Sequence, residues 1–138
     1  MLVARALSQN VFLLSLLAVV SVSRPAAAED LSGCWRGCWE SCCTGHHGPL
    51  KATFCKLDDT HYRVDFRGRF WVVVPFRYSV VLTVTGREGD KVLLAGDSYL
   101  GRLLGTFHYE AEATDCEFKA TYTSCRDRGE FALTRCCR

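Results

Sequence analysis

The stretch Gly105-Thr106-Phe107-His108-Tyr109-Glu110-Ala111-Glu112-Ala113 decides the fold class. Phe107, Tyr109, Ala111 and Ala113 fall on one side of an extended chain, and polar or charged residues fall on the other. Strict alternation of this kind is typical of a strand in a sheet that buries one face and exposes the other. We therefore expect an all-β protein built from antiparallel strands.

The same alternation recurs along the rest of the chain, and turn residues separate the repeats. Gly, Asp or Pro, which tight reversals need, occurs at 44–49, 58–59, 86–90 and 126–129. These boundaries predict eight strands, at residues 33–43, 50–57, 61–70, 76–86, 91–97, 104–113, 116–125 and 129–137. Strands at such even spacing favour a single antiparallel meander closed into a small barrel, with a sandwich as the alternative.

The N-terminal segment has the features of a secretory signal. Arg5 supplies a positive start, residues 11–22 are apolar, and Ala26-Ala27-Ala28 offers small residues for cleavage. The apolar run is shorter than the roughly 20 residues that a membrane span needs. We expect residues 1–28 to be a signal peptide and residues 29–138 to form one secreted or periplasmic domain, with no transmembrane segment in the mature chain.

Lipid anchoring is a competing interpretation of the same region. Leu31-Ser32-Gly33-Cys34 matches the bacterial lipobox, in which the cysteine is acylated. A lipobox normally follows the apolar core directly, whereas Arg24, Pro25, Glu29 and Asp30 intervene here. Cys34 also belongs to the first predicted strand, so anchoring at Cys34 is not favoured.

Removal of the signal peptide changes the charge balance. Arg5 and Arg24 are lost, so the 17 basic residues become 15, against 15 acidic residues that all lie at or after Glu29. The mature chain is then neutral when its histidines are neutral. A neutral domain lacks the positive surface that binds phosphate backbones, so no nucleic-acid partner is expected.

Two short motifs at the ends of the predicted barrel resemble the lipocalin (calycin) pattern. Gly33-x-Trp35 opens the first strand, and Arg135 lies in the last strand on the same face as Phe131 and Leu133. The resemblance implies that the tryptophan sits at the closed end of a barrel and that the late arginine packs across it. The chain also resembles uncharacterised small secreted bacterial proteins, which imply no activity.

The chain holds nine cysteines, and all of them follow residue 33. So many thiols in a short exported chain indicate a disulfide-stabilised domain. The disulfide candidates are Cys34, Cys38, Cys42, Cys43, Cys55, Cys116, Cys125, Cys136 and Cys137.

A first hairpin that turns at residues 44–49 would place Trp39 opposite Phe54 and Cys38 opposite Cys55, close enough for a disulfide. Closure of the barrel would group the remaining cysteines at its two ends. We expect Cys34 and Cys116 to pair with Cys136 and Cys137 in either order, and Cys125 to pair with Cys42 or Cys43. The odd count leaves one thiol for a possible disulfide-linked dimer.

Catalysis and metal binding are both disfavoured by the sequence. Cys42, Cys43, His46 and His47 cluster soft ligands that zinc or copper would accept, and they form a second alternative function. An oxidising compartment favours disulfides over thiolates, so we expect no metal and no cofactor. The chain has no Cys-x-x-Cys, no Gly-x-Ser-x-Gly and no inward carboxylate pair, so we expect no enzyme.

The inward side chains suggest two functions. Their aromatic bulk predicts a mostly filled interior, because a barrel of eight strands is only just wide enough for side chains or one small ligand. We expect a structural or interaction domain with an unknown extracytoplasmic partner; the alternative is a lipocalin-like carrier of a small apolar ligand. The candidate ligand-binding residues are Trp35, Trp39, Tyr62, Tyr78, Tyr109, Tyr122 and Arg135.

Two further segments stand out on the predicted outer surface. Arg63, Arg67 and Arg69 share the outward face of one strand and Arg77 enters the next. We interpret them as ordinary solvated charge around Asp65, with a stripe that meets an anionic glycan or lipid headgroup as the alternative. Residues 70–76 join these strands with apolar residues instead of a polar turn. We expect this segment to cover the barrel mouth, with an exposed apolar patch as the alternative.

Overall fold

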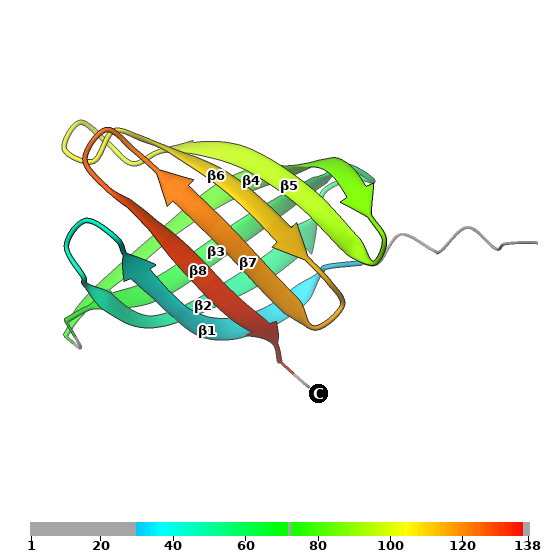
Figure 1. Cartoon of the computed structure of the whole chain (residues 1–138), viewed down its shortest axis with the longest axis horizontal. Coiled ribbons are helices and arrows are strands. Elements are labelled where there is room, and N and C mark those ends of the chain that lie inside the picture. The colour runs from blue at the N-terminus through cyan, green and yellow to red at the C-terminus, as the bar shows by residue number, and fades with distance from the viewer. Residues whose placement is uncertain (1–29, 72, 137–138) are drawn as a thin grey trace, which may run out of the picture.

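A computed structural model describes residues 30–71 and 73–136 and shows a closed barrel of eight antiparallel strands in meander order (Figure 1). The predicted signal peptide and Cys137 lie outside the described residues. The strands are β1 (Gly33–Ser41), β2 (His47–Lys56), β3 (His61–Phe70), β4 (Val74–Glu88), β5 (Lys91–Tyr99), β6 (Thr106–Ala113), β7 (Glu117–Thr123) and β8 (Arg128–Arg135). The predicted all-β fold class and the closed meander are confirmed.

The period-2 pattern determines which side chains fill the barrel. In β7, Phe118, Ala120 and Tyr122 are buried, and the residues between them are exposed. Pairing of β8 with β1 closes the barrel and sets Trp35 opposite Arg135 and Trp39 opposite Phe131. Each of the eight described strands pairs on both sides, which removes a template for aggregation.

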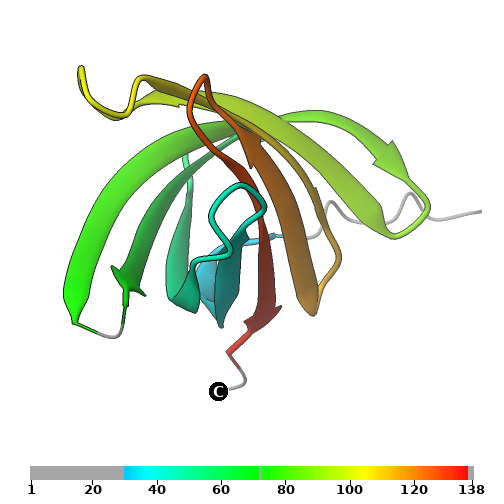
Figure 2. The same ribbon diagram turned by 60° about the vertical axis from the view of Figure 1, so that its left-hand side comes forward.

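The turns divide the barrel into two unlike ends. The β1–β2, β3–β4, β5–β6 and β7–β8 connections lie at one end, on the left in Figure 1, and we call this the open end. The other three turns and the start of β1 lie at the opposite, closed end, and Figure 2 shows the strands coiling between the two.

The predicted register of the first hairpin is wrong. β1 pairs with β2 so that Trp39 lies opposite Gly48 and Cys38 lies opposite Pro49. The chain reverses earlier than expected, because Gly45 adopts a left-handed conformation (φ 71°) and the Ser41 N–H donates to the His46 carbonyl at 2.7 Å. Cys55 is six positions from the strand partner of Cys38, which excludes a bridge between them in this register.

Glycine permits a close approach between β1 and β8. A Cβ atom at Gly37 would overlap the Ala132 carbonyl oxygen and the Leu133 Cα, which are backbone atoms and cannot move aside. Such glycines let strands coil tightly enough to close a small barrel.

Replacing Gly37 therefore tests the closure of the barrel. We expect Gly37→Ala to lower the free energy of unfolding by about 1–3 kcal/mol, the usual cost of overpacking. Gly86→Ala is the matched control, because its new Cβ would meet only the Leu93 Cδ1 at 3.7 Å. Urea unfolding measures both variants, and equal stabilities would show that β1 and β8 are not pressed together at Gly37.

Candidate functional site

The closed end is sealed by Trp35 and Arg135. Trp35 is fully buried and donates its indole N–H to the Leu31 carbonyl at 3.0 Å. The Arg135 guanidinium lies over the indole ring, 4.9 Å from its centroid, and donates to the Asp30 carbonyl and the Asp115 carboxylate. The arginine packs across the tryptophan as the lipocalin resemblance implies.

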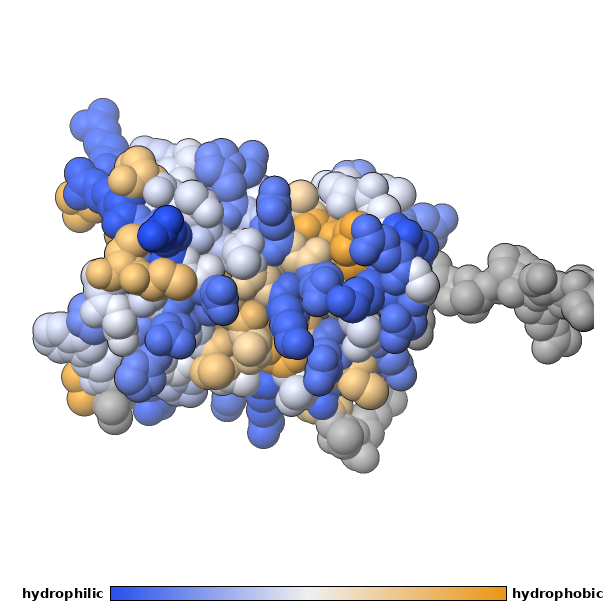
Figure 3. Space-filling view, viewed as in Figure 1, coloured by the Kyte–Doolittle hydropathy of each residue, from blue (hydrophilic) through white to orange (hydrophobic). Residues whose placement is uncertain are grey.

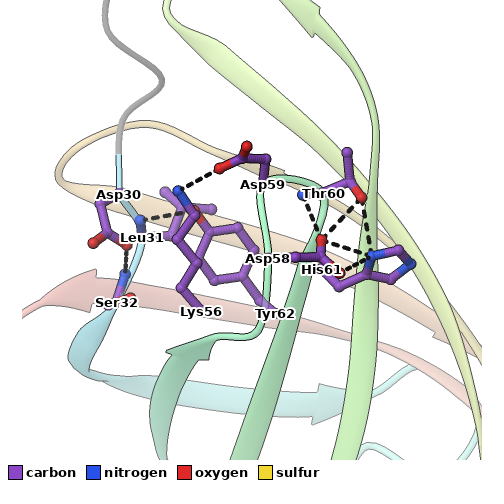
Figure 4. A network of polar contacts seen from close by, with 9 residues as sticks. All are labelled: Asp30, Leu31, Ser32, Lys56, Asp58, Asp59, Thr60, His61 and Tyr62. Carbon is purple, nitrogen blue, oxygen red and sulfur yellow. Dashed lines mark hydrogen bonds and ion pairs between the residues drawn. The ribbon is translucent and has the colours of Figure 1, made fainter.

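Tyr62 belongs to the same closed end, where its hydroxyl accepts the Leu31 N–H at 3.4 Å (Figure 4). In the neighbouring turn, Asp58 accepts the Thr60 N–H and contacts the His61 ring at 2.8 Å. These contacts hold the pKa of the Asp58 carboxyl at about 2. His61 therefore stabilises a surface turn, and Trp35, Tyr62 and Arg135 belong to the closed end of the barrel.

The open half of the barrel contains a cavity of about 460 Å³. Four of the sequence candidates, Trp39, Tyr78, Tyr109 and Tyr122, come together in its wall. The remaining lining residues are Phe70, Phe76, Arg77, Leu100, Leu104, Phe107, Arg126, Asp127 and Phe131. The expected filling of the interior therefore holds for the closed half and is wrong for the open half.

The cavity has one carboxylate in its wall, and that carboxylate is engaged. Asp127 accepts hydrogen bonds from Ser41 Oγ at 2.6 Å, from the Tyr122 hydroxyl at 3.1 Å and from the Arg128 N–H at 2.8 Å. Ser41 is itself buried at the end of β1. Asp127 therefore ties the β7–β8 turn to β1 and fixes one side of the cavity mouth.

Tyr109 brings a second polar group into the cavity. Its hydroxyl is buried near that of Tyr78, and no described residue gives it a hydrogen bond of acceptable geometry. Burial raises the pKa of Tyr109 to about 12 and raises the pKa of Tyr78 further. Burial, followed by the charge of Asp127, also raises the pKa of Tyr122. All three hydroxyls are thus neutral hydrogen-bonding groups at neutral pH.

These three tyrosines predict a loss of stability at alkaline pH. An unfolded tyrosine ionises near pH 10, whereas the folded pKa of Tyr109 is about 12. The unfolded state therefore loses its proton first, and the stability present below pH 10 falls as the pH rises through 12. A titration of tyrosinate absorbance should show three hydroxyls that ionise only with unfolding. Ionisation of all five tyrosines near pH 10 in the folded protein would contradict this.

The lining residues absent from the sequence candidates lie mainly in connections and at strand ends. Leu100 and Leu104 come from the β5–β6 connection, and Arg126 and Asp127 come from the β7–β8 turn. The alternation of side chains along a strand does not predict where residues in a connection lie. The sequence pattern therefore did not identify them as cavity residues. The Gly and Asp residues that mark the turns can be recognised in the sequence. The sequence does not show whether the side chains of those turns face the cavity.

Residues 70–76, around the β3–β4 connection, both cover the barrel mouth and expose an apolar patch, which were the two alternatives predicted from the sequence. Phe70 and Phe76 line the cavity, as a covering segment would. Trp71, Val73 and Val74 lie outside, with 66%, 75% and 52% of their surfaces exposed. Trp71 also has a positive φ of 45°, which is strained for a tryptophan.

The eight described cysteines are unbridged in the structure. Cys34 and Cys136 lie side by side across the β1–β8 closure, where the Cys136 N–H donates to the Cys34 carbonyl at 2.8 Å. A hydrogen bond between the two side chains lowers the pKa of the Cys34 thiol. Cys42 follows β1 and donates its N–H to Arg128, which follows the turn that holds Cys125.

The expected alternative metal site is not formed by the described residues. No group of three or more His, Cys, Asp or Glu side chains among residues 30–71 and 73–136 is arranged to hold a metal ion. His46 instead packs edge-on against Trp71, with ring centroids 5.3 Å apart, and His47 contacts the Gly45 carbonyl. The rings of His46 and His47 therefore contact different neighbours.

Comparison with known proteins identifies the fold but no family. No family model and no curated protein sequence matches the chain. The structure is similar to a de novo designed fluorescence-activating β-barrel, with a TM-score of 0.52 and 15% identity over 75% of this chain and 91% of that chain. It is also similar to the structure of EF1p2_mFAP2b bound to DFHBI, with a TM-score of 0.54 and 16% identity over 76% of this chain and 92% of that chain. The chain thus has the fold of a small closed antiparallel β-barrel.

Proposed function

We propose that the protein binds a small, largely apolar molecule in the cavity at the open end of the barrel. The observation that carries this proposal is an aromatic-walled cavity of about 460 Å³ that contains a buried hydroxyl without a partner, that of Tyr109. The likeness to a barrel solved with DFHBI supports the same function. We prefer this function to the interaction domain expected from a filled core, since the open half of the barrel is hollow.

The dimensions and chemistry of the cavity favour one class of ligand. Pockets for small molecules usually measure about 300–1,000 Å³ and combine an apolar lining with a few polar groups. Trp39, Phe107 and Phe131 offer flat apolar surfaces, and Tyr109 offers one hydrogen-bonding group. A planar or aromatic molecule with one polar substituent complements this wall, because its substituent would satisfy the Tyr109 hydroxyl.

We propose that the protein acts without catalysis. The one carboxylate in the cavity wall of the described chain, Asp127, already accepts three hydrogen bonds. His61 and His108 contact Asp58 and Asp97 on the outer surface, away from the cavity. This arrangement supplies no base and nucleophile that converge on a bound molecule.

We also propose that the protein is exported and carries disulfides. The apolar segment before Ala26-Ala27-Ala28 supports export, and nine cysteines in one short chain support oxidation after export. The contact between Cys34 and Cys136 makes this pair the leading disulfide. A bond there would join the two strands that close the barrel.

Titration with a fluorescent probe tests the cavity. We expect DFHBI or 8-anilinonaphthalene-1-sulfonate to bind saturably at one site per chain with increased emission, because the aromatic wall excludes water. The bound probe should also quench the emission of Trp39, which lies in that wall. If both probes show only weak binding without saturation, the cavity is not a preformed ligand site.

A further inference from the structure

A row of positive side chains crosses four adjacent strands on the outside of the barrel. Arg36 of β1 lies opposite Lys51 of β2, Lys51 lies opposite Arg67 of β3, and Arg67 lies opposite Arg77 of β4. Neighbouring strands are about 4.8 Å apart, so the row is about 14 Å long. Arg69 lies two residues beyond Arg67 on the same face. We call these five residues the basic row.

Direct opposition of like charges destabilises a sheet, and the described residues do not neutralise this row. None of the five side chains forms an ion pair with a described carboxylate. Asp65, two residues from Arg67 on the same face of β3, already contacts Arg63 and accepts a hydrogen bond from Ser79. The basic row is thus an unsatisfied array of positive charge.

The row also borders a hollow in the outer wall. Lys51, Arg67, Arg69 and Arg77 line a shallow groove of about 680 Å³, and its remaining lining residues are Pro49, Gly68, Pro75 and Phe76. A groove whose described wall holds four cations and no carboxylate accommodates negatively charged groups.

Exposed apolar side chains continue from the basic row at the open end. Trp71, Val73 and Val74 project from the β3–β4 connection directly after Arg69 and Phe70. Leu103 projects from the β5–β6 connection with 78% of its surface exposed. Figure 3 shows apolar atoms at the loop tips of this end, next to hydrophilic ones.

The basic row crosses β1 to β4, and an acidic row begins further along β1 and continues the other way around the barrel. Glu40, Glu130, Thr121 and Glu110 lie in register across β1, β8, β7 and β6. A barrel with basic and acidic sides orients in the field of a charged surface. Apolar side chains beside lysines and arginines are the combination that binds the interface of an anionic membrane.

We propose that the open end of the barrel docks on an anionic lipid bilayer. The basic row contacts the lipid phosphates, and Trp71, Val73 and Leu103 enter the region between headgroups and acyl chains. This surface is separate from the cavity wall except at Arg77 and Phe76, so docking does not depend on the proposed ligand. It places the cavity mouth against a phase in which apolar molecules dissolve.

Flotation of the purified protein with vesicles tests the proposal. We expect binding to vesicles of phosphatidylcholine mixed with phosphatidylglycerol, and little binding to phosphatidylcholine alone. Each basic residue near such a surface contributes enough that Lys51→Gln/Arg67→Gln should weaken binding about tenfold or more. The charge-matched control Arg87→Gln/Lys119→Gln, away from the row, should bind like the unchanged protein.

Tryptophan quenching distinguishes docking from simple anion binding. Trp71 is exposed, whereas Trp35 and Trp39 are buried. A soluble quencher should therefore reach Trp71 in the free protein and lose access to it on anionic vesicles. The Trp71→Gln variant should bind these vesicles more weakly although its charge is unchanged.

Three results would overturn the proposal. One is the absence of binding to anionic vesicles, and another is equal loss of binding in the test and control variants. The third is binding of inorganic phosphate or a soluble polyanion without vesicle binding or protection of Trp71, which would assign the basic row to a soluble anion.

Discussion

The variant Trp35→Ala should lose about 3–5 kcal/mol of unfolding free energy, the usual cost of removing a buried aromatic side chain. Trp35 is completely buried and packs against Phe54 and Phe118, with ring centroids 5.5 and 6.4 Å away. Its removal also leaves Arg135 without the ring that it covers. A domain whose total stability lies at the lower end of the usual range of about 5–15 kcal/mol would then be partly unfolded at room temperature.

Trp71→Ala is the matched control, because Trp71 is a tryptophan with 66% of its surface exposed. Its removal should change the stability by no more than about 0.5 kcal/mol. Chemical unfolding followed by circular dichroism measures both variants. Equal effects of the two substitutions would mean that Trp35 does not hold the closed end of the barrel.

The variant Leu100→Trp should lose probe binding while the barrel stays folded. Leu100 lies in the β5–β6 connection and lines the cavity, so the larger indole would occupy part of the 460 Å³ that a ligand needs. Overpacking by this amount costs a bound molecule about 1–3 kcal/mol, which corresponds to roughly fivefold to 150-fold in affinity. The fluorescence titration with DFHBI measures the loss.

Leu103→Trp makes the same chemical change three residues away, at a side chain that is exposed and outside the cavity wall. Its affinity for the probe should match that of the unchanged protein. If Leu103→Trp and Leu100→Trp bind the probe equally well, then the probe binds on the surface and the cavity is not the site.

The closed end was predictable because two independent signals coincide there. Alternation set the inward face of the first and last strands, and Trp35 and Arg135 both fall on it. Closure of a meander into a barrel then pairs the first and last strands, irrespective of the conformation of the turns. The packing of Arg135 on Trp35 followed from the resemblance and is confirmed by the structure.

The register of the first hairpin was not predictable from the same kind of pattern. Residues 44–49 contain two glycines and a proline, and each of them is a good turn residue. The structure turns at Gly45 and leaves Gly48 and Pro49 inside β2. Because the chain turns at Gly45, Cys38 pairs with Pro49, six residues before the predicted partner Cys55. The predicted Cys38–Cys55 disulfide is therefore excluded in this register.

The cavity was not predicted because alternation shows on which side of the sheet a side chain lies, but not its position along the barrel axis. Phe54 and Phe118 crowd around Trp35 at the closed end, so their bulk fills only that half. At the open end, the cavity is bounded in part by Leu100, Leu104 and Asp127, which lie in connections between strands. Alternation does not predict the positions of such residues.

Mass spectrometry of the purified protein under native conditions, and then after denaturation without reductant, tests most directly whether the cavity holds a ligand. The account predicts an additional mass of a few hundred daltons, in keeping with a cavity of about 460 Å³, that is lost on denaturation. The remaining chain should match residues 29–138 less eight hydrogens, because nine cysteines form four disulfides and leave one thiol. Identical native and denatured masses, together with no uptake of DFHBI by the same sample, would contradict a ligand-binding barrel.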